Sequence, residues 1–414
     1  MPGSEKTKEY RIGIDARFFG LENKGLGRYT NELLQGIDRL DQEKKQGENS
    51  AGVGNLTRRI VYYVFLLPEK YDEFQPRAKN IKKIKAPWRW YSWREQFFFP
   101  FLLRKYRLDL VHFLHFNVPV FFYKKDFVVT IHDLTLFHYP TFRNTTLNKF
   151  FYLGKLLAYH FLIRRVVKKA RRIVAISKFT KKDLQKTLAV PAEKIKVIYE
   201  GYDFLPVDRR EFSESAGKGD ILKKYAIMEG YILYVGNAYP HKNLERLLLA
   251  WQRFGEAGLV GKRKLLLVGK NDYFYDKLKK FVAERGIKKV IISNQVSDEE
   301  LDSLYRRADL FVFPSLYEGF GLPPLEALAR GVPVISSDSG SLPEILGKNV
   351  LYFKAESVNS IFEALKKGLE KASHEKGKMS LSGKYFLQKK KYSWRKMAKK
   401  TIALYEEVLK EKEK

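Results

Sequence analysis

The sequence predicts an α/β protein built from two doubly wound parallel sheets, one in each of two domains. Three observations support this fold class. Short apolar strands alternate with helical segments along the whole chain, which is the pattern of parallel sheets. The chain has 414 residues, which is too long for one hydrophobic core, so two domains of about 200 residues each are expected. Residues 205–222 are rich in charged residues, serine and glycine and are expected to link the domains.

This linker sets the other expected boundaries. Residues 1–9 are charged and are expected to be disordered. The first domain is expected to span residues 10–204 and the second residues 223–392. The last segment, residues 393–414, is expected to form one helix.

The composition limits the class of protein. There is no cysteine, so disulfides and thiolate metal sites are excluded. Residues 1–9 lack the apolar core of a signal peptide. No run approaches the roughly 20 apolar residues that a membrane-spanning helix needs. These features favour a cytoplasmic protein, either soluble or peripheral at the inner face of the cell membrane.

The net charge of +31 is unevenly distributed along the chain. Residues 51–200 hold 30 Lys and Arg against 10 Asp and Glu, and residues 371–400 hold 11 against one. Such a surface attracts nucleic acid, anionic lipid or anionic nucleotides, and composition does not choose among them.

Two segments interleave basic and aromatic residues. Residues 79–107 include Trp88, Trp90, Trp93 and four phenylalanines among lysines and arginines. Residues 145–172 are expected to form a long amphipathic helix with an apolar stretch followed by a cationic end. Two interpretations stay open. This composition suits an anionic membrane interface, and it equally suits helices that bury phenylalanines and expose charges.

The clearest local pattern lies at residues 310–335. A strand over Leu310–Phe313 turns at Pro314 into a Gly-x-Gly loop, and a helix begins at Pro323 or Pro324. A new strand begins at Val332. A glycine loop that opens a helix N-terminus offers unpaired N–H groups and a dipole to an anionic ligand.

Two carboxylates accompany this anion site. Glu318 lies on the loop and Glu326 in the first turns of the helix, with seven residues between them. Carboxylates repel a phosphate, so their expected partners are the neutral hydroxyls of the same ligand. A ligand with both phosphates and hydroxyls is a nucleotide or a nucleotide sugar.

These residues carry a family resemblance. Pro314–Glu326 resembles the Glu-x7-Glu motif of retaining glycosyltransferases with the GT-B fold, the family numbered four, and Ala327–Ser337 and Gly340–Ile345 are similar to that family's continuation. The resemblance implies two Rossmann-like domains that face each other across a cleft. It also implies that the last helix crosses back to the first, acceptor-binding domain.

Three further loops of the first domain are similar to the same family. A strand over Tyr10–Ile14 leads to the loop Lys24–Arg28 and a helix from about Tyr29, which resembles the family's Gly-x-Gly-Arg-Tyr loop. His132 resembles the histidine that contacts the transferred sugar, and residues 115–117 an acceptor-facing loop. Ser177, expected to cap a helix, opens a motif similar to one at the family's interdomain cleft.

The histidines also have a rival interpretation. His112, His115 and His132 follow or end two neighbouring strands, where α/β sheets place ligands. Three histidines can bind zinc, but the spacings that accompany such sites are missing.

In the second domain, the loop Gly236–Asn243 resembles the family's donor-binding loop, and Lys242 can neutralise a diphosphate. The family often has an arginine after the glycine, where this sequence has Asn237, so Lys242 is the main expected cation. The strand ends at Gly269 and Val296 match those that hold the base in the family.

The resemblance implies transfer of a sugar from a nucleotide donor with retained configuration and no further cofactor. No Asp-x-Asp triplet occurs, so no metal is expected at the diphosphate. The implied site residues are Glu318, His132 and Lys242 for catalysis, Gly25, Gly27, Gly236, Asn237, Lys242, Gly269, Val296, Glu318, Gly319, Phe320, Gly321, Leu322 and Glu326 for the donor, and His115, Asn117 and Ser177 for the acceptor.

The donor favoured by the resemblance is GDP-mannose, and the acceptor is a glycan or lipid-linked molecule of cell-surface polysaccharide or glycolipid synthesis. A UDP-glucose-type glucosyltransferase, a nucleotide-sugar epimerase and a glycan phosphorylase of the same fold remain alternatives. A basic nucleic-acid-binding protein is a further alternative, because it also explains the charge of +31.

Overall fold

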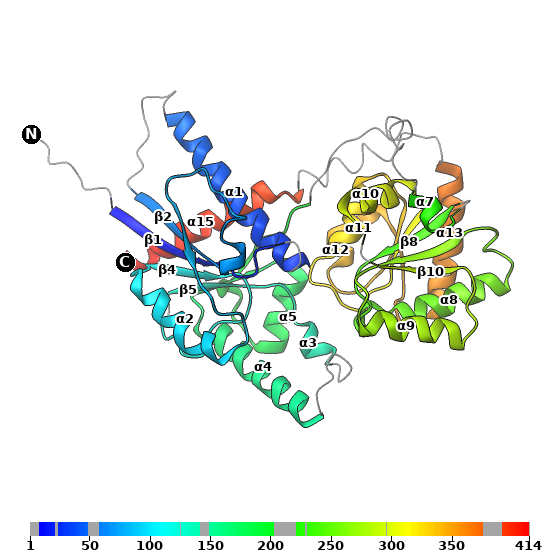
Figure 1. Cartoon of the computed structure of the whole chain (residues 1–414), viewed down its shortest axis with the longest axis horizontal. Helices are drawn as coiled ribbons and strands as arrows, with labels where there is room; N and C mark the ends of the chain where they lie inside the picture. The colour runs from blue at the N-terminus through cyan, green and yellow to red at the C-terminus, as the bar shows by residue number, and fades with distance from the viewer. Residues whose placement is uncertain are drawn as a thin grey trace, which may run out of the picture. The chain divides into compact units, whose positions relative to one another are not determined.

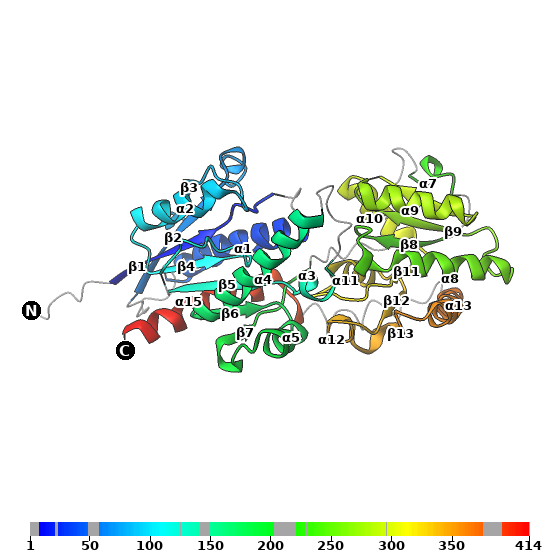
Figure 2. The same cartoon turned by 90° about the horizontal axis from the view of Figure 1, so that it is seen from below.

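The structure, a computed structural model, describes residues 8–20, 24–48, 58–124, 126–140, 149–202, 221–227, 230–294, 296–375 and 391–413. The chain divides into two compact units (Figures 1 and 2). The first unit is Met1–Leu134, Leu147–Gly201 and Tyr392–Lys414, and the second is Thr135–Thr146 and Tyr202–Lys391. Most of residues 1–9 and of the expected linker at 205–222 lies outside the described residues.

A seven-stranded parallel sheet forms the centre of the first unit, with the strand order β3-β2-β1-β4-β5-β6-β7. Its strands are β1 (Lys8–Asp15), β2 (Arg58–Leu66), β3 (Ile81–Lys85), β4 (Leu110–Phe113), β5 (Phe127–Ile131), β6 (Arg172–Ala175) and β7 (Ile195–Val197). The order reverses between β1 and β4, and ligands of such sheets bind at the carboxyl edge beside this reversal.

Helices cover both faces of this sheet, as parallel strands buried on both faces require. They are α1 (Lys24–Glu48), α2 (Trp93–Lys105), α4 (Lys149–Lys169), α5 (Lys178–Leu188) and α15 (Trp394–Glu413), with single 3-10 turns η2 (Pro68–Lys70) and η4 (Ala192–Lys194).

The last helix, α15, lies beside α1 in the first unit (Figure 1), as the sequence predicts. The two helices approach closely because Gly36 of α1 has no side chain: a Cβ there would lie 2.6 Å from the Cβ of Ala398. On the sheet side, the Tyr405 hydroxyl of α15 lies 2.6 Å from Nδ1 of His112 on β4.

A six-stranded parallel sheet forms the second unit, with the order β10-β9-β8-β11-β12-β13. Its strands are β8 (Tyr231–Val235), β9 (Lys264–Val268), β10 (Val290–Ser293), β11 (Leu310–Phe313), β12 (Val334–Ser337) and β13 (Leu351–Phe353). Its helical segments are α3 (Thr135–His138), α7 (Ile221–Lys224), η5 (Pro240–Lys242), α8 (Leu244–Glu256), α9 (Tyr273–Glu284), α10 (Asp298–Arg307), α11 (Leu322–Ala329), α12 (Leu342–Leu346), η6 (Gly347–Asn349) and α13 (Val358–Glu375). The prediction of two doubly wound parallel sheets is confirmed.

Local differences from the prediction have physical causes. The expected loop Lys24–Arg28 is the first part of α1, since glycine is tolerated where the helical N–H groups need no partner inside the helix. The strand β3 was not predicted, because its sequence Ile-Lys-Lys-Ile-Lys belongs to a charged edge strand. Residues 135–146 group with the second unit, where His138 and Tyr139 pack against Tyr317.

Among the helices that the structure describes, none is both long and apolar enough to cross a membrane.

Candidate active site

The ends of β8 and β9 meet through two glycines in the second unit. A Cβ on Gly269 would lie 2.1 Å from the carbonyl oxygen of Gly236, so any other residue at position 269 would force the backbone to move. The hydroxyl of Tyr275 donates to the Gly236 carbonyl at 2.8 Å, and that of Tyr234 to the Asn237 carbonyl at 2.7 Å. Burial raises the pKa of both tyrosines, so both hydroxyls keep the proton they donate.

The next turn carries Lys242 and is fixed by its neighbour. Asn243 adopts the left-handed conformation with φ 62° and is buried. Its Nδ2 donates to the carbonyls of Pro314 at 3.0 Å and of Ala355 at 2.7 Å. The backbone of the lysine turn is therefore held against the residues that follow β11.

Lys242 and Glu318 form a direct ion pair. The Nζ of Lys242 lies 2.5 Å from Oε1 of Glu318, and their side chains are 13% and 12% exposed. Lys242 also lies 5.7 Å from the ring centre of Phe313. The two residues that the sequence assigns to the diphosphate and to the sugar are thus adjacent in space.

The Glu318 loop rests on residues 340–341. Gly340, with φ 64°, passes so close that a Cβ would lie 2.8 Å from the Glu318 nitrogen. The N–H of Ser341 donates to the Glu318 carbonyl at 3.2 Å, and its hydroxyl donates to the Phe320 carbonyl at 3.0 Å. These contacts hold the backbone of Gly319–Gly321 in place.

The N-terminus of α11 offers fewer backbone N–H donors than an ordinary helix N-terminus. Gly321 (φ 89°) is the N-cap and makes no side-chain hydrogen bond, so the helix end is not capped by its own residue. Pro323 and Pro324 fill the second and third helical positions and have no N–H. Leu322 therefore supplies the single N–H of the first three helical residues, and further donors must come from the loop amides.

Glu326 is the fifth residue of α11, two positions after Pro324, and is half-buried. The Tyr305 hydroxyl donates to its Oε2 at 3.1 Å. Arg330 donates to the Glu326 carbonyl at 3.0 Å and covers the ring of Tyr305 at 5.0 Å. One carboxylate oxygen is thus engaged by the tyrosine that fixes the side chain. Val296, which the sequence places near the base together with Gly269, is half-buried.

In the first unit, His132 follows β5 and is held at both ring nitrogens. Its Nδ1 lies 3.2 Å from Oε1 of Glu200, and its Nε2 lies 3.0 Å from the Leu114 carbonyl. Burial alone lowers the pKa of His132, but the hydrogen bond and charge of Glu200, with Leu114 and Asp133, outweigh it and raise the pKa.

The other two histidines behave differently. His112 is fully buried between Thr130, 2.9 Å from its Nε2, and Tyr405 of α15, so its role is to join the helix to the sheet. His115 packs against Phe18 and Phe116. Burial lowers the pKa of both His112 and His115 to about 3, so both rings are neutral.

Asn117 is buried and oriented by Glu95 of α2. Its Nδ2 donates to Oε1 of Glu95 at 2.8 Å, while its Oδ1 is buried with no hydrogen-bond partner. The same Oε1 accepts from Arg17 at 2.7 Å, and Arg17 also makes a bidentate pair with Asp15 at 2.8 and 2.7 Å. An unsatisfied buried acceptor costs free energy, so it is a candidate to receive a substrate hydroxyl.

The remaining predicted residues of this unit lie at helix ends. Gly25 is exposed and Gly27 is buried in the first turns of α1. Ser177 is fully buried as the N-cap of α5 and accepts from the Thr180 N–H at 3.0 Å. The Thr180 hydroxyl then donates to the His132 carbonyl at 3.3 Å, so Ser177 reaches the histidine through Thr180.

Sequence reasoning missed the residues that hold these groups: Asp15, Arg17, Glu95, Glu200 and Tyr305. Arg17 and Glu95 lie 78 positions apart in the sequence, so no short sequence pattern predicts that they pair. The sequence did contain a signal in the charge of these residues, because Asp15 ends the buried strand β1, Arg17 comes two residues after it, and Glu200 comes three residues after β7.

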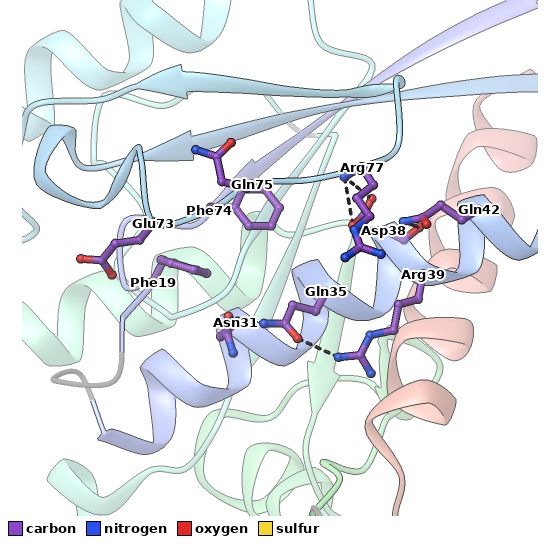
Figure 3. Close-up of a pocket in the computed structure, with 10 residues that line it drawn as sticks. All are labelled: Phe19, Asn31, Gln35, Asp38, Arg39, Gln42, Glu73, Phe74, Gln75 and Arg77. Carbon is purple, nitrogen blue, oxygen red and sulfur yellow. Dashed lines mark hydrogen bonds between the residues drawn. The ribbon is translucent and has the colours of Figure 1, made fainter. Parts of the chain in front are cut away.

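A hollow of about 390 Å³ lies between α1 and residues 73–77 (Figure 3). It is lined by Phe19, Asn31, Gln35, Asp38, Arg39, Gln42, Glu73, Phe74, Gln75 and Arg77. Gln35 is bonded to Arg39, and Asp38 accepts from the Arg77 N–H. The hollow contains none of the predicted site residues. Across the described part of the chain, no group of His, Asp or Glu is arranged to hold a metal ion.

The comparisons with known proteins identify the family and the fold of the chain. Residues 219–382 match the family model of glycosyl transferases group 1, and residues 55–204 match that of glycosyltransferase family 4. The chain is 30% identical over 404 residues to O-antigen chain mannosyltransferase B of Escherichia coli, covering 92% of this chain and 95% of the relative.

Two further similarities extend the comparison. An O-antigen chain mannosyltransferase of Salmonella typhimurium is 29% identical over 278 residues, covering 67% of this chain and 69% of the relative. The solved sucrose-phosphate synthase of Thermosynechococcus elongatus superposes with a TM-score of 0.66 at 19% identity, over 96% of this chain and 99% of that one. The chain therefore belongs to the family 4 glycosyltransferases, has their GT-B fold, and is an enzyme that transfers a hexosyl group from a nucleotide sugar.

Proposed function

We propose that this enzyme is a retaining mannosyltransferase that uses GDP-mannose and extends a glycan or a lipid-linked acceptor in cell-surface polysaccharide or glycolipid synthesis. The observation that carries the site assignment is the Lys242–Glu318 pair next to the N-terminus of α11. The O-antigen mannosyltransferases at 29% and 30% identity support mannose as the sugar.

The donor is proposed to lie along the carboxyl edge of the second sheet. Lys242, the amides of Gly319–Gly321 and the N–H of Leu322 bind the diphosphate. Glu318 accepts from sugar hydroxyls and Glu326 from the ribose. Gly236, Asn237, Gly269 and Val296 complete the donor site next to the base.

Residues of the first unit are proposed to serve the sugar and the acceptor. His132 is placed at the transferred sugar, and His115 and Asn117 at the acceptor, with the unpaired Oδ1 of Asn117 accepting a hydroxyl. Ser177 acts through its cap on α5. Gly25 and Gly27 are proposed to belong to the donor site.

The proposed reaction keeps the configuration of the sugar. The bond between the anomeric carbon and the diphosphate oxygen breaks, the acceptor oxygen bonds to that carbon on the same face, and the acceptor's proton passes to the departing diphosphate. Negative charge develops on the diphosphate, and each preorganised donor that meets it is worth roughly 3 kcal/mol. Lys242 and the amides supply this stabilisation in the proposal, without a metal ion.

The test is a thermal-shift screen with GDP-, UDP-, dTDP- and ADP-sugars, with and without EDTA. A donor at 100 times its dissociation constant adds about 2.7 kcal/mol of stability. We expect GDP-mannose to give the largest shift and EDTA to change nothing. A larger shift with UDP-glucose would replace mannose by glucose. NMR of the product distinguishes a retained from an inverted anomeric centre, and product formation without an acceptor would indicate an epimerase.

A second proposal is that the first unit contacts an anionic membrane. Its exposed large apolar residues lie on α2, on the loop 119–124 and on α4: Trp93, Phe97, Phe98, Phe101, Phe121, Tyr123, Leu153, Leu157 and Phe161. These segments are joined, because Phe97 stacks on Phe121 at 4.5 Å and Arg165 donates to the Val120 carbonyl at 2.5 Å. Apolar rings beside basic side chains suit an interface with anionic headgroups.

Sedimentation with phosphatidylglycerol vesicles tests this contact against phosphatidylcholine vesicles. We expect binding to the anionic vesicles that weakens with salt, and weaker binding by Trp93→Ala and Phe101→Ala. Tyr273→Ala removes an equally exposed ring from α9 of the second unit and is the control. Equal binding to both vesicles, or salt-sensitive binding to RNA instead, would contradict the membrane proposal.

A further inference from the structure

Both ring nitrogens of His132 face oxygen atoms that can only accept. Nδ1 lies 3.2 Å from a carboxylate oxygen of Glu200, and Nε2 lies 3.0 Å from the carbonyl of Leu114. A neutral imidazole has one N–H and would point a lone pair at one of these acceptors. The imidazolium, with two N–H groups, satisfies both.

The position of the ring is fixed from other sides as well. Tyr29 of α1 meets the ring edge-on with centroids 4.8 Å apart. Thr180 donates to the His132 carbonyl at 3.3 Å. The side chains of His132 and Glu200 are 18% and 7% exposed, so water screens their interaction weakly.

The charged and titratable groups around His132 favour its cationic form. Glu200 and Asp133 bring negative charge, and no other nearby histidine competes, because burial lowers the pKa of His112 and His115 to about 3. Burial also raises the pKa of Tyr29, which therefore stays neutral.

Glu200 is presented from a rigid stretch of backbone. The following residue, Gly201, is packed so closely on the returning chain that a Cβ there would lie 2.1 Å from the Trp394 nitrogen. Gly201 is also the residue at which the chain leaves the first unit. This packing fixes the backbone next to Glu200, and the Glu200 side chain itself is buried beside His132.

We propose that Glu200 is a positioning residue of the transferase: its carboxylate holds His132 as an imidazolium with a fixed ring, and His132 does not serve as a base. This inference rests on the proposed placement of His132 at the transferred sugar. With both nitrogens occupied, His132 has no lone pair for the acceptor's proton. The absence of a free lone pair agrees with a reaction in which the donor's own diphosphate takes the proton. The imidazolium also places a permanent positive charge at His132 in the first unit.

The experiment compares the wild-type enzyme with Glu200→Gln by NMR of ¹⁵N-histidine-labelled protein, with His132→Gln used to assign the signal. In the wild type we expect both His132 nitrogens to carry protons at neutral pH and to titrate above 6.5. In Glu200→Gln we expect a lower titration midpoint. Glu193→Gln, an exposed glutamate in the turn before β7, is the matched control and should leave the signal unchanged.

The kinetic readout is the pH profile of kcat. We expect wild-type kcat to be level around neutral pH. In Glu200→Gln it should fall as pH rises through the lowered midpoint, about tenfold for each pH unit beyond it, and recover on acidification, with the donor KM little changed. A purely structural role would lower activity at every pH alike.

Two outcomes would overturn the proposal. One is a wild-type His132 that is neutral at pH 7, which needs no variant to observe. The other is a Glu200→Gln enzyme whose kcat profile matches the wild type although its His132 midpoint has moved. Failure of the proposed function is distinguishable, because a protein that transfers no sugar still reports the protonation of His132 by NMR.

Discussion

The Nζ of Lys242 lies 2.5 Å from Oε1 of Glu318, in a setting where seven-eighths of each side chain is withdrawn from water. In the proposed donor site, the pair brings a cation for the diphosphate and a carboxylate for hydroxyls into direct contact. Each partner keeps the other oriented, and a diphosphate that binds here must share Lys242 with Glu318. A preorganised charge of this kind needs little rearrangement during reaction.

Substitutions of Lys242 and Glu318 should therefore have different effects on donor binding and on turnover. Lys242→Ala removes the cation and leaves Glu318 to repel the diphosphate, so donor affinity and turnover should both collapse. Glu318→Gln frees Lys242, so donor binding should persist while kcat falls by roughly 10² or more. Calorimetric donor titration and initial rates measure both. Lys279→Ala, which breaks an exposed pair with Asp276, is the control. Full activity in either site variant would refute the assignment.

The glycine that begins α11 should be essential for donor binding. Gly321→Ala places a Cβ at φ 89° and 2.7 Å from Leu342, so the loop must shift. Gly331, at the other end of the same helix, also has positive φ (72°) but has open space around it. Both alanine variants should lose about 1–3 kcal/mol of stability from backbone strain, and only Gly321→Ala should lose donor affinity. Equal donor affinities would show that the loop backbone does not contact the donor.

The buried pairings of Arg17 should dominate the stability of the first unit. Arg17→Ala leaves Asp15 and Glu95 buried without their cation, an effect of about 3–5 kcal/mol. Arg89→Ala, which removes an exposed pair with Glu69, should change stability by about 0–1 kcal/mol. Thermal and urea unfolding of the variants measure this difference. Similar effects of the two substitutions would mean that Arg17 is not the counter-ion of both carboxylates.

Acid should weaken the attachment of α15 through His112. Burial lowers the pKa of His112 from 6.5 to about 3, so the unfolded chain binds its proton more readily. The contribution of His112 is complete above pH 6.5 and is lost toward pH 3, by about 1.4 kcal/mol per pH unit. His112→Asn should flatten the pH dependence of unfolding in this interval. His132, with its raised pKa, has the opposite sign: its contribution is complete below 6.5 and lost at higher pH. An unchanged slope in His112→Asn would contradict this account.

The sequence predicted most strands because each is buried on both faces and so forms an apolar run. The strand β11 begins and ends where the sequence places it, and β1 extends two residues before and one residue after the predicted Tyr10–Ile14. The edge strand β3 was missed because its alternating lysines have no apolar run to reveal it. The donor loop was predicted from adjacent residues, since its glycines and glutamates lie within nine positions of one another.

The supporting residues could not be predicted in the same way. Glu95 meets Asn117 and Arg17 only after α2 packs on the sheet. Glu200, which follows β7, meets His132, which follows β5, across the intervening strand β6. The loss of two N–H donors at α11 to Pro323 and Pro324 was visible in the sequence. The missing N–H groups matter because Gly321, the N-cap, has no side chain to cap the helix, and this cap position could not be predicted from the sequence.

The return of α15 to the first unit also dictates an order of events during synthesis. The sheet that β1 begins cannot acquire Tyr405 as the partner of His112 until the ribosome has made the entire second unit. The second unit consists of the short segment Thr135–Thr146 and the continuous segment Tyr202–Lys391. Both segments leave the ribosome before Tyr392–Lys414, which completes the first unit. In a nascent chain stalled before residue 392, His112 would lack its partner Tyr405. The face of the first unit that α15 later covers would then be exposed to chaperones.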